Sequence, residues 1–80
     1  MKTVVFTDRT AKDFDALPTQ ARLAISQALD AYAMKGEGDV AKLKGREGYR
    51  VRVGSYRVIF IEDAETITAI YVGRRTTTTY

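Results

Sequence analysis

Strict alternation of apolar and polar residues over residues 48–60 predicts a β-hairpin. Successive side chains of an extended chain point to opposite faces, so one face should carry Tyr49, Val51, Val53, Tyr56, Val58 and Phe60. The other face should carry Arg50, Arg52 and Arg57. Gly54-Ser55 suits a two-residue type II′ turn, which would place Arg52 directly opposite Arg57. The hairpin should therefore have one apolar face and one face of clustered arginines.

The first half of the chain shows helical spacing after a short strand at residues 2–7. Apolar residues recur at three-residue intervals over residues 11–17, and Pro18 ends this helix because the residue before a proline is pushed out of the helical region. A second helix should begin at Pro18 or Thr19 and end near Gly36. Its buried stripe consists of Ala21, Ile25, Ala28, Leu29 and Tyr32.

The remaining segments complete a small sheet. Residues 36–48 are expected to form a loop anchored in the core by Leu43, and residues 66–72 a last strand after a polar turn. The order β-α-α-β-β-β predicts an α+β fold, with a mainly antiparallel four-stranded sheet and a helical hairpin packed on one face. The face with the arginines should stay free. Eighty residues suffice for one modest core, so residues 1–80 are expected to form a single domain.

The composition limits the chemistry. The chain has no cysteine and no histidine, which excludes disulfides and thiolate zinc sites and removes the usual general base near neutral pH. No group of carboxylates has a spacing typical of a magnesium site, so we expect neither a metal nor another cofactor. No apolar run is long enough to cross a bilayer, and the N-terminus lacks a secretory signal segment. A cytoplasmic protein without a membrane partner is therefore expected.

Positive charge is concentrated in the second half of the chain. Residues 1–41 carry five basic and six acidic residues, whereas residues 42–80 carry eight basic and four acidic ones. The net charge of +3 thus understates the charge of the C-terminal half. This asymmetry points to a nucleic acid or another polyanion as the partner of that half.

The arginine cluster is the strongest candidate site. Solvated arginines on the outer face of an ordinary hairpin are the alternative, because edge strands use charge to prevent aggregation. Three arginines that converge in space, flanked by Ile59 rather than by acidic partners, favour phosphate binding instead. Guanidinium groups pair bidentately with phosphate oxygens and can stabilise the charge of a phosphoryl-transfer transition state.

Other basic and aromatic residues could extend this site. Arg74 and Arg75 leave the last strand after Gly73, and at least one of them should reach the rim of the arginine face, unless both belong to a frayed terminus. Tyr80 could stack on a base or donate a phenolic proton. The residues expected to contact phosphate without reading sequence, or otherwise to serve solubility, are Lys42, Lys44 and Arg46.

The chain resembles the RelE branch of the RelE/ParE toxin superfamily. The resemblance rests on Leu43-Lys44-Gly45, on the hairpin at residues 48–60 and on Tyr71-Val72-Gly73-Arg74-Arg75 followed by a late tyrosine. The preceding strand and helical hairpin also occur in that family in the same order. The resemblance implies a microbial-ribonuclease-like fold and a toxin of a type II toxin–antitoxin pair.

RelE-type toxins enter the ribosomal A site and cut mRNA without a metal, which implies an endoribonuclease that inhibits translation. The 2′-hydroxyl attacks the adjacent phosphate and leaves a cyclic phosphate. By position, Arg57 matches the phosphate-stabilising arginine, Arg75 the arginine after the last strand and Tyr80 a base-stacking tyrosine. Arg50 and Arg52 stand where relatives often have lysines, one of which has been assigned as the base. Since the pKa of arginine exceeds about 12, the group that accepts the proton is unassigned.

The resemblance implies Arg52, Arg57, Arg75 and Tyr80 as catalytic residues, and Arg50 and Arg74 as RNA contacts beside the loop residues. The implied partners are the ribosome with its mRNA and an antitoxin with an acidic segment that folds over the basic face. DNA would be contacted only indirectly, through the antitoxin complex. Two alternatives stay open: a ParE-like toxin of the same fold that inhibits DNA gyrase by protein binding, and a weakly catalytic or non-catalytic antitoxin-binding module.

Overall fold

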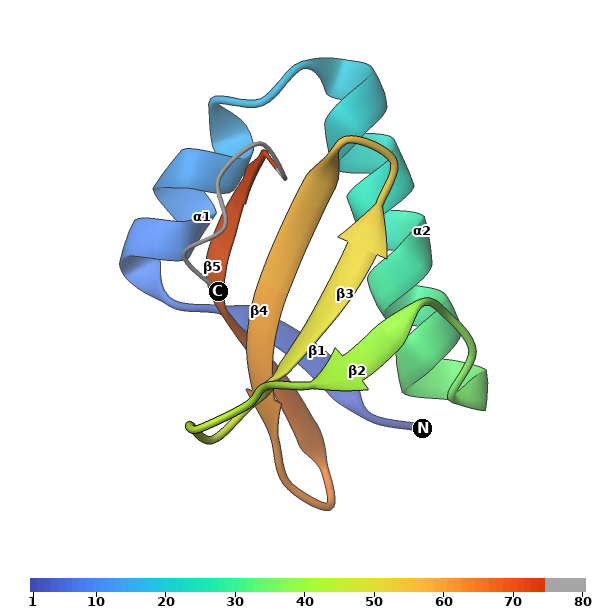
Figure 1. The fold of residues 1–80 in the computed structure, drawn as a ribbon. Coiled ribbons are helices and arrows are strands. Elements are labelled where there is room, and N and C mark those ends of the chain that lie inside the picture. Colours follow the sequence, from blue (N-terminus) through green and yellow to red (C-terminus); the bar gives the residue numbers. More distant parts are fainter. Residues whose placement is uncertain (75–80) are drawn as a thin grey trace.

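The computed structural model describes residues 1–74, which form a five-stranded sheet and two helices. In chain order the elements are β1 (Thr3–Phe6), α1 (Asp8–Asp15), α2 (Thr19–Lys35), β2 (Val40–Lys42), β3 (Tyr49–Val53), β4 (Tyr56–Glu62) and β5 (Thr66–Arg74) (Figure 1). The strand order is β1-β5-β4-β3-β2. Only the β1–β5 pair of this sheet is parallel, and the other neighbours are antiparallel. The predicted α+β class and mainly antiparallel sheet are confirmed.

The prediction of four strands was wrong by one, because residues 40–42 are not part of a loop. They form β2, in which Val40 lies opposite Val51 and Lys42 opposite Tyr49. Three residues carry too little alternation to predict a strand from sequence. The segment becomes a strand because the outer edge of β3 offers backbone N–H and C=O groups that need partners.

The helix α2 has the predicted boundaries, whereas α1 begins three residues before the apolar spacing that starts at residue 11. Thr7 caps α1, because its Oγ1 accepts a hydrogen bond from the backbone N–H of Thr10 at 3.2 Å. The helix α2 begins at Thr19, directly after Pro18, and ends at Gly36, whose φ of 70° is left-handed. Within residues 1–74, no helix combines the length and the apolar composition needed to cross a membrane.

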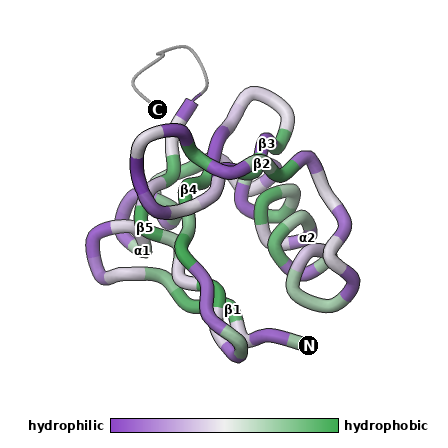
Figure 2. The backbone as a smooth tube through the Cα atoms, turned by 60° about the horizontal axis from the view of Figure 1, so that its bottom comes forward, coloured by the Kyte–Doolittle hydropathy of each residue, from purple (hydrophilic) through white to green (hydrophobic). Residues whose placement is uncertain are grey.

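The core lies between the helices and one face of the sheet. Its buried residues are Ile25, Leu29, Ala33, Val51, Val58, Phe60, Ile67, Ala69 and Val72. Phe14 of α1 packs against this core and contacts Phe6 of β1, with ring centroids 4.9 Å apart. In Figure 1, α2 lies behind the sheet and α1 beside β5. Figure 2 shows hydrophobic stretches along α2, β4 and β5. Both helices therefore cover the same face.

The central hairpin has the predicted register. Val53 lies opposite Tyr56, and Arg52 lies opposite Arg57. Gly54 has a φ of 58°, which is the positive value that the first central position of a type II′ turn requires. The turn therefore fixes the two arginines directly across from each other.

The strand β5 changes its alternation at a bulge. Ile59 lies opposite Tyr71, whereas the next residue, Phe60, lies opposite Ala69, so Ile70 is the extra residue. Ala69 faces the helices, and regular alternation would turn Tyr71 to the same side. The bulge instead turns Tyr71 to the side of Ile59, away from the helices.

Candidate functional site

The arginine face is the side of the sheet away from the helices, around Arg50, Arg52 and Arg57. Arg52 and Arg57 lie directly opposite each other on β3 and β4, and Arg50 lies opposite Ile59. Arg52 is exposed, whereas Arg50 and Arg57 are half-buried. Like charges at directly opposed positions cost roughly 0.2–1 kcal/mol. An anion bound between Arg52 and Arg57 would offset this repulsion, so the arrangement favours an anionic ligand.

An apolar residue underlies these cations. Ile59 is fully buried, although it lies on the face away from the core. Its neighbours on the adjoining strands are Arg50 and Tyr71, and the Nε atom of Arg57 is buried as well. Arginine stems cover apolar surface while the guanidinium stays accessible. An anion held here would interact more strongly than at a fully hydrated site, because nearby apolar groups lower the effective dielectric constant.

Arg50 has an acidic neighbour, which corrects the expectation from the hairpin sequence. Its Nη1 donates to the Oδ1 of Asp39 at 3.4 Å and to the backbone oxygen of Asp39 at 3.2 Å. The backbone N–H of Arg52 donates to the same backbone oxygen at 3.1 Å. Asp39 immediately precedes β2, so its position became predictable only once β2 was known to pair with β3.

Tyr71 also belongs to this face, and sequence reasoning missed it as a site residue. Gly73 follows two residues later and lies opposite Arg57. A Cβ atom at Gly73 would lie only 2.9 Å from the Cζ of Tyr71, so the phenol leans over the glycine. Tyr71 is thereby a diagonal neighbour of Arg57 across β4 and β5. The glycine two residues after Tyr71 was the sequence signal that could have identified this residue. It could be interpreted only once the bulge was known to turn Tyr71 outward.

The loop cations lie elsewhere. Lys42 and Arg46 line a hollow of about 420 Å³ together with Tyr49 and Glu62. Tyr49 is the first residue of β3. The last residue of that strand, next to Arg52, lies about 13 Å further along it. Lys44, between the two, is exposed in the loop that leads to β3. The structure therefore groups Lys42 and Arg46 at the opposite end of the sheet from the Arg52–Arg57 pair.

Arg74 lies on the other side of the sheet. It is opposite Tyr56, and its guanidinium carbon is 5.6 Å from the centroid of the Tyr56 ring. Tyr56 packs against the core, so Arg74 belongs to the helix-facing side at the sheet edge. Arg75 and Tyr80 lie outside the described residues.

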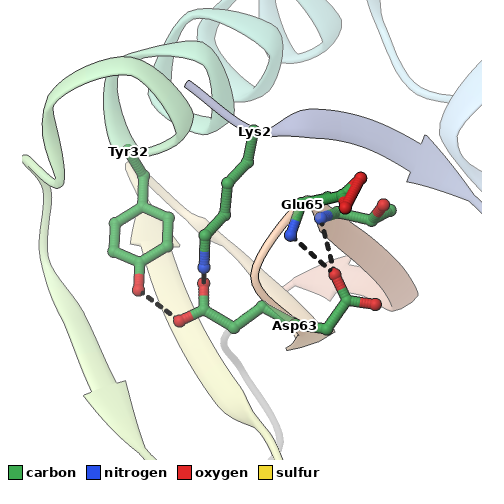
Figure 3. A network of polar contacts seen from close by, with 6 residues as sticks. Lys2, Tyr32, Asp63 and Glu65 are labelled. Atoms are coloured by element: carbon green, nitrogen blue, oxygen red, sulfur yellow. Dashed lines mark hydrogen bonds and ion pairs between the residues drawn. The ribbon is translucent and has the colours of Figure 1, made fainter.

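A polar cluster ties the N-terminus to the far end of the sheet (Figure 3). Tyr32 donates to Oε1 of Glu62 at 2.9 Å, and Lys2 donates to Oε2 of Glu62 at 3.1 Å. Burial, followed by the hydrogen bond to Glu62, raises the pKa of Tyr32 to about 12. Both oxygens of this carboxylate are thus engaged within the fold, and the cluster serves to hold β1, α2 and β4 together.

The turn between β4 and β5 is closed by Asp63. Its Oδ1 accepts from the backbone N–H groups of Glu65 and Thr66, each at 2.8 Å (Figure 3). These bonds lower the pKa of Asp63. The carboxylate of Asp63 therefore has a structural role. Among residues 1–74, no three acidic side chains lie together as metal ligands would.

Known proteins were compared with the chain by sequence and by structure. No family model matches the sequence, and no curated protein matches it. The structure is similar to a RelB–RelE antitoxin–toxin complex from Methanococcus jannaschii, with a TM-score of 0.72 and 26% identity over 89% of this chain and 90% of that one.

Two further structures extend this similarity. A RelE–RelB complex from Pyrococcus horikoshii has a TM-score of 0.79 and 23% identity over 96% of this chain and 98% of that one. The isolated RelE toxin of E. coli has a TM-score of 0.82 and 19% identity over 99% of this chain and 89% of that one. The chain therefore has the RelE-type toxin fold, as the sequence resemblance predicted.

Proposed function

We propose that this chain is the toxin of a toxin–antitoxin pair and cuts mRNA at the ribosome without a metal. The observation that carries the proposal is the directly opposed pair Arg52 and Arg57, on the helix-free face of a RelE-type fold. Two guanidinium groups on directly opposed residues can hold one phosphate between them. Arg50, on the same face, is the candidate contact for a neighbouring phosphate.

The proposed reaction is transesterification within the RNA. The 2′-oxygen attacks the adjacent phosphorus, the bond from phosphorus to the 5′-oxygen breaks, and a 2′,3′-cyclic phosphate and a 5′-hydroxyl result. The proton of the 2′-hydroxyl must leave, and the 5′-oxygen must gain one. Arg52 and Arg57 stay protonated at neutral pH, so their part is to orient the phosphate and to stabilise the extra negative charge of the transition state.

The proposed roles of the remaining site residues rest on different observations. Arg75 and Tyr80 are proposed as catalytic groups only on the sequence resemblance. Lys42, Lys44 and Arg46 are proposed as contacts to a more distant part of the RNA or to ribosomal RNA, because they lie away from the Arg52–Arg57 pair. The position of Arg74 on the helix-facing side makes it a weaker candidate for the same RNA strand.

An antitoxin is the proposed protein partner. The solved complexes from M. jannaschii and P. horikoshii pair RelE with RelB. A segment rich in carboxylates could neutralise the arginine face as phosphate would, and it would exclude RNA at the same time. We place this action in the cytoplasm, where ribosomes and mRNA meet.

Cell-free translation with primer extension on the translated mRNA tests the proposal. The chain should produce cuts in translated messages, and Arg57→Ala should reduce cutting by about 100-fold or more, as loss of one preorganised charge contact does elsewhere. Arg22→Ala is the matched control, because Arg22 lies at the α1–α2 junction and bonds to Asp15 and Thr19. Uncut mRNA together with gyrase inhibition would refute the proposal and support the alternative target.

A further inference from the structure

The phenol of Tyr71 fills the space that Gly73 leaves open on the outer face of β5. A Cβ atom at Gly73 would collide with the Oη of Tyr71 and would lie 2.9 Å from its Cζ. Tyr71 is half-buried, so its ring lies against the sheet rather than extending into solvent. The hydroxyl of Tyr71 therefore lies close to the point where a side chain at position 73 would begin.

This hydroxyl belongs to a row of polar groups that crosses the sheet. Gly73 lies directly opposite Arg57, and Arg57 lies directly opposite Arg52. Side chains at opposed positions begin about 4.5–5.5 Å apart. The Oη of Tyr71 thus takes the third place in the row, beside Arg57 and on the side away from Arg52. The buried Nε of Arg57 shows that the stem of this arginine also lies low on the sheet. A phosphate held by the two arginines would therefore have the phenolic hydroxyl on its β5 side.

The 5′-oxygen of the RNA needs a proton in the reaction proposed above, because an alkoxide is a poor leaving group. Arg52 and Arg57 cannot supply this proton, since a guanidinium is not deprotonated in proteins. The chain has no histidine, which is the side chain most often used as a general acid. A tyrosine hydroxyl is another group that performs this task in enzymes. The hydroxyl beside Arg57 is therefore suited to protonating the leaving oxygen.

We propose that Tyr71 is the general acid of the cleavage and protonates the 5′-oxygen as it leaves. This inference rests on the proposed function and adds a catalytic residue to it. Tyr71 is a different group from Tyr80, the late tyrosine of the sequence resemblance. It lies on β5 itself, within the sheet that carries the arginines.

Proton transfer from Tyr71 accompanies the cleavage of the bond from phosphorus to the 5′-oxygen. The O–H bond of the phenol breaks, so a 5′-hydroxyl and a phenolate result, and Arg57 stabilises the phenolate by its positive charge. The 2′-oxygen bonds to phosphorus and loses its proton to water, and the phenolate regains a proton from water. Attacking and leaving oxygens lie on opposite sides of phosphorus. The RNA should therefore lie with its 5′-oxygen toward β5 and its 2′-oxygen toward β3.

RNA with sulfur in place of the bridging 5′-oxygen tests this role. A thiol is far more acidic than an alcohol, so a thiolate leaves without a general acid. Ribosomes are programmed with a short mRNA that carries the sulfur at the bond that the wild-type chain cuts. Single-turnover rates are then measured above the toxin-free background. Tyr71→Phe should cut the oxygen RNA about 100-fold more slowly than the wild-type chain, but the sulfur RNA at nearly the wild-type rate.

Two other variants serve as controls for this experiment. Arg57→Ala should be slow on both RNAs, because the arginine stabilises charge on the phosphate whichever atom leaves. Tyr56→Phe also removes a phenolic hydroxyl, but from a residue that packs against the core on the helix-facing side. It should cut both RNAs as fast as the wild-type chain does.

The rates separate this inference from the proposed function. The role of Tyr71 would be overturned if Tyr71→Phe cut the oxygen RNA at the wild-type rate, or if it were slowed equally on both RNAs. Either result would leave the proposed function intact. An oxygen RNA that the wild-type chain leaves uncut would instead refute the proposed function itself. Rescue of Tyr71→Phe on the sulfur RNA would support the general acid and would show that the variant is folded and holds its substrate.

Discussion

Arg50 and Asp39 form an ion pair within the arginine face, with 3.4 Å between Nη1 and Oδ1. The arginine side chain is 19% exposed and the aspartate side chain 62% exposed. The chain thus supplies its own carboxylate to one of three guanidinium groups that otherwise repel one another. Any phosphate or foreign carboxylate that approaches Arg50 must compete with it.

Asp39→Asn should therefore tighten the binding of RNA. Exposed ion pairs contribute about 0–1 kcal/mol, so we expect a gain in affinity of up to about fivefold, largest at low salt. Fluorescence anisotropy with a short single-stranded RNA measures it. Asp30→Asn, on the exposed side of α2, changes the net charge equally and should have little effect. Weaker binding after Asp39→Asn would mean that the aspartate orients Arg50 for RNA rather than competing for it.

Arg52 and Arg74 should differ in how much they contribute to the salt dependence of RNA binding. Each phosphate contact with a single strand contributes about 0.7 to the slope of log affinity against log salt concentration. Arg52→Ala should lower this slope by about that amount, whereas Arg74→Ala should leave it unchanged, because Arg74 lies over Tyr56 on the helix-facing side. Equal losses for both variants would show that the RNA wraps around the sheet edge.

Gly73→Ala should destabilise the protein. The new Cβ would overlap the ring of Tyr71, which must move or distort the strand, at a cost of about 1–3 kcal/mol. Urea unfolding measures the change. In a Tyr71→Thr background the obstacle is gone, and Gly73→Ala should then be neutral or stabilising, by up to about 1 kcal/mol. A cost that is the same in both backgrounds would show that Tyr71 does not lean over Gly73 in solution.

Tyr32 should make stability dependent on alkaline pH. Its pKa in the folded protein is about 12, raised from 10.0, so the folded state favours the protonated phenol. This contribution is fully present below pH 10 and is lost as the pH rises toward 12. Tyr32→Phe should cost about 1 kcal/mol near neutral pH, and the difference between the two proteins should shrink above pH 10. Unfolding by urea at a series of pH values checks this, and a constant difference would contradict it.

The sequence was sufficient for both helices, for four of the five strands and for the register of the central hairpin, because these rest on local rules. Alternation and the turn at Gly54 placed Arg52 opposite Arg57, and Pro18 marked the start of α2 at Thr19. It was not sufficient for β2, which forms only because β3 has an edge to pair with. The ion pair of Arg50 with Asp39 depends on that same pairing and could not be predicted before it.

The bulge explains why the faces of the residues beyond it could not be predicted from the sequence. Counting alternate residues from the start of β5 puts Tyr71 toward the core and Arg74 on the outer face. One extra residue, Ile70, exchanges both assignments. No local signal announces it, because Ile70 is a favourable strand residue in either register. What decides the register is the packing of Val72 against the core and the space that Gly73 leaves for Tyr71.

The same residue gives β5 an unusual tolerance to a change in length. In a regular strand, the loss of one residue exchanges the core and solvent faces for everything that follows. Loss of Ile70 would instead restore plain alternation, with Ala69 and Val72 still inward and Tyr71 still outward.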